Sequence, residues 1–166
     1  MFRAMRRSKQ QLSDEEAVEI LEHGKTGVLA VAGDEGYPYT VPINYVYADG
    51  KIYMHSAKAG HKVDAIETND KASFCVIDRD DVVPSDYSTL FRSVVAFGRI
   101  RIMDEESAKM AAIRLLGDKY NPGQDEALEA EIARAYSRMH MIEFEIEHLT
   151  GKQAKELARV KGPLDD

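Results

Sequence analysis

The sequence predicts a mainly β (α+β) fold, in which five or six antiparallel strands form a small barrel with flanking helices. Three observations predict it: short runs rich in β-branched and aromatic residues, tight turns that join them, and only one short helical segment among the first strands. Strands joined by tight turns are antiparallel, whereas a doubly wound parallel sheet would need a helix after nearly every strand.

The first predicted element is a helix that begins after Ser13. Ser13 and Glu16 have the spacing of a capping box, in which the serine side chain accepts from a helix N–H and the glutamate reaches back. Apolar residues at positions 17, 18, 20 and 21 follow at helical spacing, and Gly24 marks the expected end.

The next segments predict four strands and one short helix. Residues 27–32 form an apolar run, and residues 39–47 are rich in β-branched and aromatic side chains. Asp49-Gly50 is a strong hairpin signal before the alternating residues 51–55. A helix is expected from residue 61 to about 67, followed by a strand over residues 72–77.

The second half of the chain predicts a long strand over residues 93–103. The preceding residues 78–92 are polar and contain Pro84, which predicts an irregular loop that could cover a ligand pocket. Two helices are expected at residues 105–116 and 126–139, because Asn121-Pro122-Gly123 breaks the periodicity. The strict alternation of residues 141–146 predicts a closing strand with its glutamates on the solvent side.

Composition limits the function classes. The 166 residues suit one domain, which we place at residues 1–152 with a charged tail at 153–166. A net charge of −7 argues against nucleic-acid binding, and no apolar run approaches the roughly 20 residues of a membrane span. The single cysteine, Cys75, excludes an internal disulfide and agrees with a reducing cytoplasm. We expect a cytoplasmic protein that acts on a small molecule.

Several common sites are missing from the sequence. It has no Gly-x-x-x-x-Gly-Lys-Ser/Thr loop, no Gly-x-Gly-x-x-Gly and no Gly-x-Ser-x-Gly elbow. The five histidines do not fall at His-Glu-x-x-His spacing, and one cysteine cannot complete a thiolate zinc site. No metal is therefore predicted.

The segment from Tyr37 to Asp64 has features of a phosphate site. Ser56 and the N–H groups near Ala57 lie at a strand end, and Lys62 lies in the first turn of a helix, whose N-terminus favours anions. Pro42 removes a ladder donor, so the backbone there lies at an edge or faces a planar ligand. Each feature also has an ordinary interpretation: Lys62 as a solvated charge, Ser56 as a turn residue and Pro42 as an edge marker.

The same segment resembles the pyridoxamine 5'-phosphate oxidase-like FMN-binding split barrels, and most closely their nitroimidazole-resistance branch. The resemblance is strongest at residues 36–45 (GYPYTVPINY) and at residues 52–57 (IYMHSA) with Gly60 and Lys62. It also includes residues 5–7 (MRR), 92–99 (RSVVAFGR) and, weakly, 150–152 (TGK). The sequence departs from the oxidase itself, since it lacks the paired arginines and the arginine-rich C-terminal substrate end.

The resemblance implies a six-stranded antiparallel split β-barrel and a homodimer with FMN at its interface. It places the flavin ring beside Thr40, Val41, Pro42, Ile43 and Asn44. It places the ribityl chain and phosphate beside His55, Ser56 and Ala57, with His61 and Lys62 on the phosphate. It also implies that the partner subunit supplies Arg92 and Ser93.

The implied activity is an FMN-dependent oxidoreductase that reduces small electron-poor substrates, such as nitroaromatics, with electrons from NAD(P)H. His55 is the candidate catalytic residue, because an imidazole can donate a proton near neutral pH. The second interpretation of His55 is a hydrogen bond to FMN or the main chain without proton transfer. The alternative functions are a non-catalytic flavin-binding or redox-stress module, and a haem or deazaflavin binder of the same fold.

Overall fold

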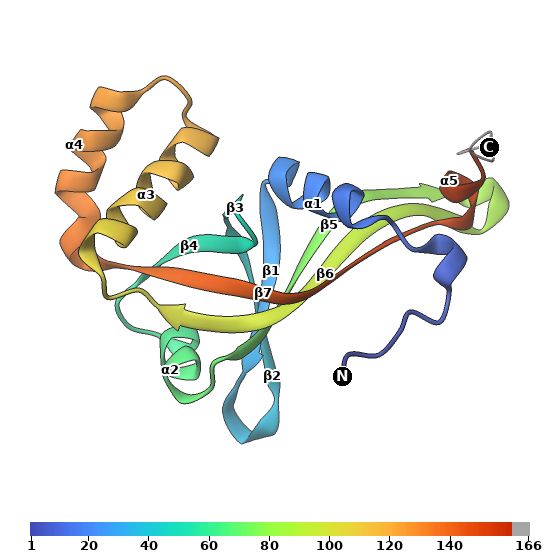
Figure 1. The fold of residues 1–166 in the computed structure, drawn as a ribbon, viewed down its shortest axis with the longest axis horizontal. Helices are drawn as coiled ribbons and strands as arrows, with labels where there is room; N and C mark the ends of the chain where they lie inside the picture. The colour runs from blue at the N-terminus through green and yellow to red at the C-terminus, as the bar shows by residue number, and fades with distance from the viewer. Residues whose placement is uncertain (161–166) are drawn as a thin grey trace.

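The computed structural model describes residues 1–160 and contains one antiparallel sheet of seven strands (Figure 1). The order across the sheet is β2-β1-β5-β6-β7-β4-β3. The strands are β1 (Thr26–Ala32), β2 (Pro38–Asn44), β3 (Val46–Ala48), β4 (Lys51–Ala57), β5 (Lys71–Val83), β6 (Ser88–Ile102) and β7 (Met139–Gln153). The mainly β fold with flanking helices is confirmed.

Five helices surround this sheet: α1 (Asp14–His23), α2 (His61–Thr68), α3 (Glu106–Tyr120), α4 (Asp125–Ala135) and α5 (Lys155–Val160). Helices α3 and α4 stand together as a pair at one end of the molecule, opposite the tip of the β5–β6 hairpin (Figure 1). No helix in the described range is both long and apolar enough to cross a membrane.

Two local predictions are confirmed in atomic detail. The Ser13 hydroxyl accepts from the Glu16 N–H at 3.2 Å, and the Glu16 carboxylate accepts from the Ser13 N–H at 3.0 Å. Between β3 and β4, Asp49 and Gly50 have φ values of 49° and 78°. Two successive positive φ values are the requirement of the tight hairpin turn that Asp-Gly favours.

The predicted strand over residues 39–47 is divided at Tyr45 into β2 and β3, which lie at opposite edges of the sheet. The division has a clear cause. The Tyr120 hydroxyl accepts from the Tyr45 N–H at 3.0 Å and lies 2.9 Å from the Tyr45 carbonyl oxygen, so a side chain replaces the strand partner. The sheet therefore has seven strands, no ladder among residues 1–160 closes it, and the six-stranded split barrel is not confirmed.

The irregular loop predicted at residues 78–92 is wrong. Strands β5 and β6 continue as a hairpin to Val83 and Ser88, with a register shift between Ile77 and Arg79 and a short turn at residues 84–86. Most side chains along this extension are exposed or half-buried. Polar residues are therefore compatible with a strand here, which is why their pattern imitated a loop.

The position of Glu143 also differs from the prediction. β7 is longer than expected, and the Glu143 side chain is only 6% exposed, although it lies on the outer face. Its carboxylate binds Lys51 on β4 at 3.1 Å and Arg101 on β6 at 2.9 Å. Burial tends to raise the pKa of this carboxyl group, but hydrogen bonds from Arg101 and Lys51 hold the pKa below its usual range.

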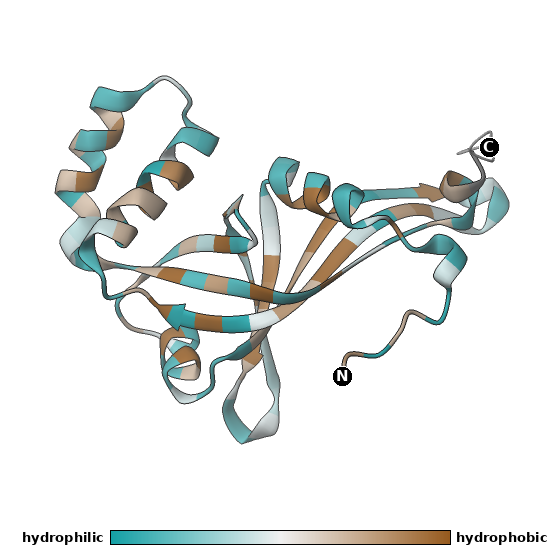
Figure 2. Ribbon diagram, viewed as in Figure 1, coloured by the Kyte–Doolittle hydropathy of each residue, from teal (hydrophilic) through white to brown (hydrophobic). Residues whose placement is uncertain are grey.

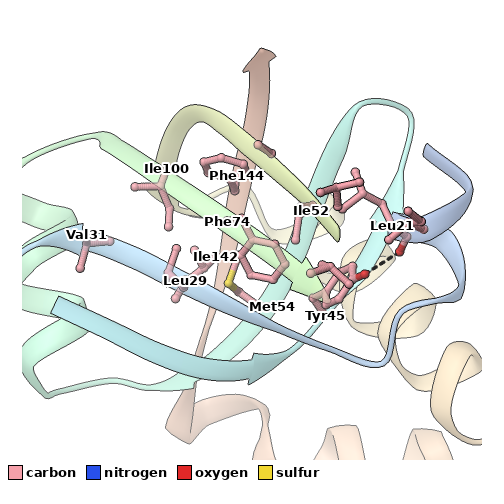
Figure 3. Packing of buried hydrophobic residues seen from close by; sticks show 14 of the residues in the cluster. Leu21, Leu29, Val31, Tyr45, Ile52, Met54, Phe74, Ile100, Ile142 and Phe144 are labelled. Carbon is pink, nitrogen blue, oxygen red and sulfur yellow. Dashed lines mark hydrogen bonds between the residues drawn. The ribbon is translucent and has the colours of Figure 1, made fainter. Parts of the chain in front are cut away.

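The sheet curls around an interior apolar cluster (Figure 3). Phe74 and Phe144 are fully buried there, and the Tyr45 ring meets Phe74 edge-on at 5.0 Å. The Tyr45 hydroxyl donates to the Leu21 carbonyl at 2.8 Å and so ties α1 to the interior. Strands β6 and β7 alternate in hydropathy along their length, as strands with one face toward a core do (Figure 2).

A second, smaller cluster lies on the outer face of the sheet. Its buried members are Met103, Ala112, Ile113, Ile132 and Met141, which come from β7, from the segment after β6, and from α3 and α4. This cluster attaches the α3–α4 pair to the sheet. Beyond β7, the predicted tail continues as Ala154, which is buried, and α5, while residues 161–166 lie outside the described part.

Candidate functional site

The outer face of β2 presents three of the five predicted ring-binding residues. Burial alternates along the strand, so Val41 and Ile43 pack against the interior cluster while Thr40, Pro42 and Asn44 are exposed. β2 is an edge strand, which agrees with the prediction from Pro42. A ligand on this face would meet the side chains of the exposed three residues and the backbone of the other two.

The end of β4 lies beside this face and contributes His55 and Ala57. Both are exposed, whereas Ser56 points to the interior and is 4% exposed. The Ser56 hydroxyl donates to the Ala57 carbonyl at 2.7 Å, so it is already used within the strand. The sequence pattern already implies this position, because the period of two places Ser56 on the same face as the apolar Ile52 and Met54.

The N-terminus of α2 supplies the predicted phosphate end of the site. Gly60 caps the helix with φ 127° and ψ 165°, a conformation that only glycine adopts readily, and no side chain caps the first turn. The His61 ring stacks on the Tyr39 ring of β2 at 4.1 Å, which brings this helix end next to β2. Lys62 lies in the first turn, half-buried, and forms no ion pair within the described residues.

Arg92 and Ser93 lie far from these residues within one chain. They pair with the C-terminal end of β7, whereas His55 and Ala57 pair with its N-terminal end. β7 has fifteen residues, so at about 3.3 Å per residue its two ends are tens of ångströms apart. The Arg92 guanidinium lies 3.8 Å from Glu16 and 3.7 Å from Asp78. Their contribution from a partner subunit stays a prediction.

A groove of about 520 Å³ opens where β2 and β4 meet the helix pair. Predicted site residues Asn44, His55, Ser56 and Ala57 line one end of it. The opposite walls come from α3 and α4, and the floor includes Met139 and Met141 of β7. The groove therefore begins where the predicted flavin-binding residues end.

Comparison with known proteins places this chain in a family. A family model described as pyridoxamine 5'-phosphate oxidase matches residues 13–153. The chain belongs to the pyridoxamine 5'-phosphate oxidase family. None of the curated proteins compared with the chain matches it.

Solved structures share the fold of this family member. A candidate 5-nitroimidazole antibiotic resistance protein from Bacteroides thetaiotaomicron superposes with a TM-score of 0.70 at 19% identity, covering 86% of this chain and 85% of that one. A FAD-binding protein from Mesorhizobium loti gives 0.61 at 24% identity, covering 87% and 97%. The flavocytochrome Anf3 from Azotobacter vinelandii gives 0.78 at 23% identity, covering 98% and 75%.

Some residues that line the groove were not predicted from the sequence. Tyr120, Leu116, Leu128 and Met139 all border the groove, yet none was a predicted site residue. The available signal was the pair of amphipathic helices after residue 104, whose apolar faces needed a surface to cover. Within residues 1–160, no group of three or more His, Cys, Asp or Glu side chains could hold a metal ion.

Proposed function

We propose that this member of the pyridoxamine 5'-phosphate oxidase family binds FMN and acts as an oxidoreductase on small electron-poor substrates, such as nitroaromatics, with electrons from NAD(P)H. The observation that carries the proposal is the contact between α2 and β2, through the rings of His61 and Tyr39 at 4.1 Å. This contact brings the N-terminus of α2, which no side chain caps, next to the edge strand β2. The helix N-terminus could then bind the phosphate of a ligand whose planar ring lies along β2.

The residues present fit a flavin. At the phosphate end, Gly60 leaves open space where a Cβ would lie, so a ligand can approach the backbone closely, and Lys62 can neutralise a phosphate. At the ring end, the exposed face of β2 offers main-chain groups of an edge strand together with the side chains of Thr40 and Asn44. The surface thus offers groups for both the phosphate and the ring of the ligand.

FMN would supply the two-electron redox chemistry, and the chain would bind, orient and shield it. His55 is exposed next to Asn44 at the mouth of the groove, where its imidazole could hold a proton for a substrate oxygen. The competing role for His55 is a hydrogen bond to the ligand without proton transfer. His55→Ala separates the two roles, because loss of turnover with FMN retained supports proton donation.

The proposal includes a homodimer with the flavin between subunits, in a cytoplasmic protein. Its support is the projecting β5–β6 hairpin, on which Ile77, Val82 and Tyr87 are 61%, 69% and 100% exposed. Large exposed apolar side chains on a long hairpin favour a partner surface. A second copy would also place Arg92 and Ser93 near a site that they cannot reach in one chain.

The first experiment is an absorption spectrum of the purified protein, followed by release and chromatography of the cofactor. FMN in the site predicts a flavin spectrum, and Lys62→Ala should weaken FMN binding by about 1–3 kcal/mol. Lys71→Ala, at an exposed position at the start of β5, is the matched control and should not change FMN binding. A colourless protein that does not take up added FMN would reject the proposal.

FAD or haem is the second candidate ligand, since similar structures include a FAD-binding protein and a flavocytochrome. The same spectrum distinguishes them, because haem has an intense Soret band that flavins lack. Chromatography of the released cofactor separates FAD from FMN. Reduction by NADH or NADPH, followed by reoxidation with metronidazole, then separates an enzyme from a non-catalytic flavin-binding module.

A further inference from the structure

The groove beside the candidate flavin site is a preformed space between two layers. Its floor is the outer face of β4 and β7, where His55 pairs with Met141 and Ala57 with Met139 in the sheet register. Its walls are α3 and α4, which stand over this end of the sheet (Figure 1). A volume of about 520 Å³ lies within the range of roughly 300–1,000 Å³ found for small-molecule sites.

Small residues keep the groove open. Ala57 on the floor and Ala135 on the α4 wall leave room that larger side chains would fill. The two helices approach closely at Gly117 of α3, where a Cβ would lie 2.4 Å from the Leu128 side chain of α4, and Arg114 of α3 pairs with Glu129 of α4 at 2.9 Å. This close approach fixes the helix pair while the space below it stays unfilled.

The lining is mostly apolar, and its polar residues are Asn44, His55, Ser56, Tyr120, Asn121, Glu131 and Arg138. The Tyr120 hydroxyl is used by the Tyr45 backbone, and the Ser56 hydroxyl by Ala57. The Asn44 amide and the His55 imidazole make no hydrogen bond within the described residues, and both are exposed. These two groups are therefore available to a ligand oxygen at the end nearest β2.

The apolar wall of the groove disfavours an anionic ligand against it. Glu131 is paired with Arg134, and Arg138 is an exposed side chain that donates to the Arg134 carbonyl at 3.2 Å. No Lys or Arg belongs to the apolar part of the wall formed by Ile113, Leu116, Leu128 and Ile132. A carboxylate or sulfonate against that wall would lose its hydration, and the exposed Arg138 is the only Lys or Arg among the described residues that line the groove.

We infer that this groove is the substrate subsite and that it takes a neutral, flat, largely apolar molecule with one acceptor oxygen directed at Asn44 and His55. The inference rests on the proposed flavin site, because it places the Asn44 and His55 end of the groove against the flavin ring. It deepens that proposal in one respect: the α3–α4 pair, rather than the sheet, determines which substrates enter.

The test uses calorimetric titration with nitrobenzene and with 4-nitrobenzoate, a matched pair that differs by one negative charge. Titrations are made with and without FMN, so that binding is measured independently of the flavin. Nitrobenzene should bind at least tenfold more tightly than 4-nitrobenzoate. Ala135→Leu, which fills the groove, should weaken nitrobenzene binding at least tenfold and leave FMN binding unchanged.

Ala133→Leu is the control, because Ala133 is exposed on the same helix and does not line the groove. It should bind nitrobenzene as the unaltered chain does. If Ala135→Leu disturbs folding, Ala57→Leu fills the same space from the sheet side and should give the same loss of nitrobenzene binding in the titrations without FMN, where the proposed flavin role of Ala57 does not enter.

Three results would overturn the inference: unchanged nitrobenzene binding in both filled variants, equal binding of 4-nitrobenzoate, or dissociation of a dimer by the filled variants in sedimentation. The last result would assign the groove to a second copy of the chain. Failure of FMN binding with retained, groove-dependent nitrobenzene binding would reject the proposed function and support the subsite.

Discussion

The two faces of β4 border regions that are packed in different ways. On the inner face, Ile52 and Met54 belong to a cluster in which Phe74, Tyr45 and Phe144 are fully buried. On the outer face, the cluster under α3 and α4 has five buried members and adjoins a groove of about 520 Å³. One strand thus separates a filled interior from an unfilled layer, and we assign stability to the first and binding to the second.

The largest expected effect tests the filled side. Phe74→Ala should lower the free energy of unfolding by about 3–5 kcal/mol, because it removes a large buried ring and leaves a cavity. Leu128→Ala, at the groove wall, should cost clearly less, because this side chain is only partly buried and its removal exposes less apolar surface. Urea unfolding followed by circular dichroism measures both. Equal losses would contradict the contrast between the two layers.

The next effect concerns the glycine at the start of α2, which belongs to the binding side. Gly60→Ala should lower stability by about 1–3 kcal/mol, because φ 127° and ψ 165° are strained for any residue with a Cβ. It should also weaken FMN binding, since the strain is relieved by moving the helix end. Gly123→Ala, at φ 73° in the turn before α4, is the control. It should lose stability and keep its FMN affinity.

Tyr120 joins the two regions, because it borders the groove and holds the backbone of buried Tyr45. Tyr120→Phe leaves the Tyr45 N–H without this partner and should cost about 1–3 kcal/mol of unfolding free energy. Tyr37→Phe, at a side chain that is 76% exposed, should cost almost nothing. If the two substitutions cost the same, the hydroxyl is not what divides β2 from β3.

Local chemistry explains which parts of the fold the sequence predicted. The capping box at Ser13 and the Asp49-Gly50 turn depend on residues a few positions apart, and the edge position of Pro42 follows from a missing N–H. The break at Tyr45 depends on Tyr120, seventy-five positions later, so no local pattern could show it. The β5–β6 hairpin was missed because an exposed extension lacks the alternation that reveals a half-buried strand.

In the candidate site too, local features were predicted from the sequence and features that depend on long-range packing were not. Asn44, His55 and Ala57 were predicted and lie together at the mouth of the groove. The groove itself was not predicted, because its shape depends on where α3 and α4 pack against β7. The inward position of Ser56, in contrast, follows from the alternation of β4, because Ser56 shares a face with the apolar Ile52 and Met54.

The smallest effect is electrostatic and lies on the outer face, at Glu143. Its carboxylate is nearly buried between Lys51 and Arg101, which are 33% and 56% exposed, so Glu143→Gln should cost only about 1 kcal/mol at neutral pH. Because Arg101 and Lys51 hold the folded-state pKa below its usual range despite burial, the unfolded chain takes up this proton first as the pH falls.

The contribution of Glu143 is therefore complete above the unfolded pKa of about 4.3 and disappears as the pH falls through the folded value. Urea unfolding from pH 7 to pH 3 should show the stability difference between the original chain and Glu143→Gln shrinking below about pH 4.5. Glu145→Gln is the control, at an exposed position on the same face that makes no ion pair within residues 1–160. A difference that persists at pH 3 would mean that Glu143 acts through packing rather than through its charge, and the outer layer would then resemble the interior more closely than its groove suggests.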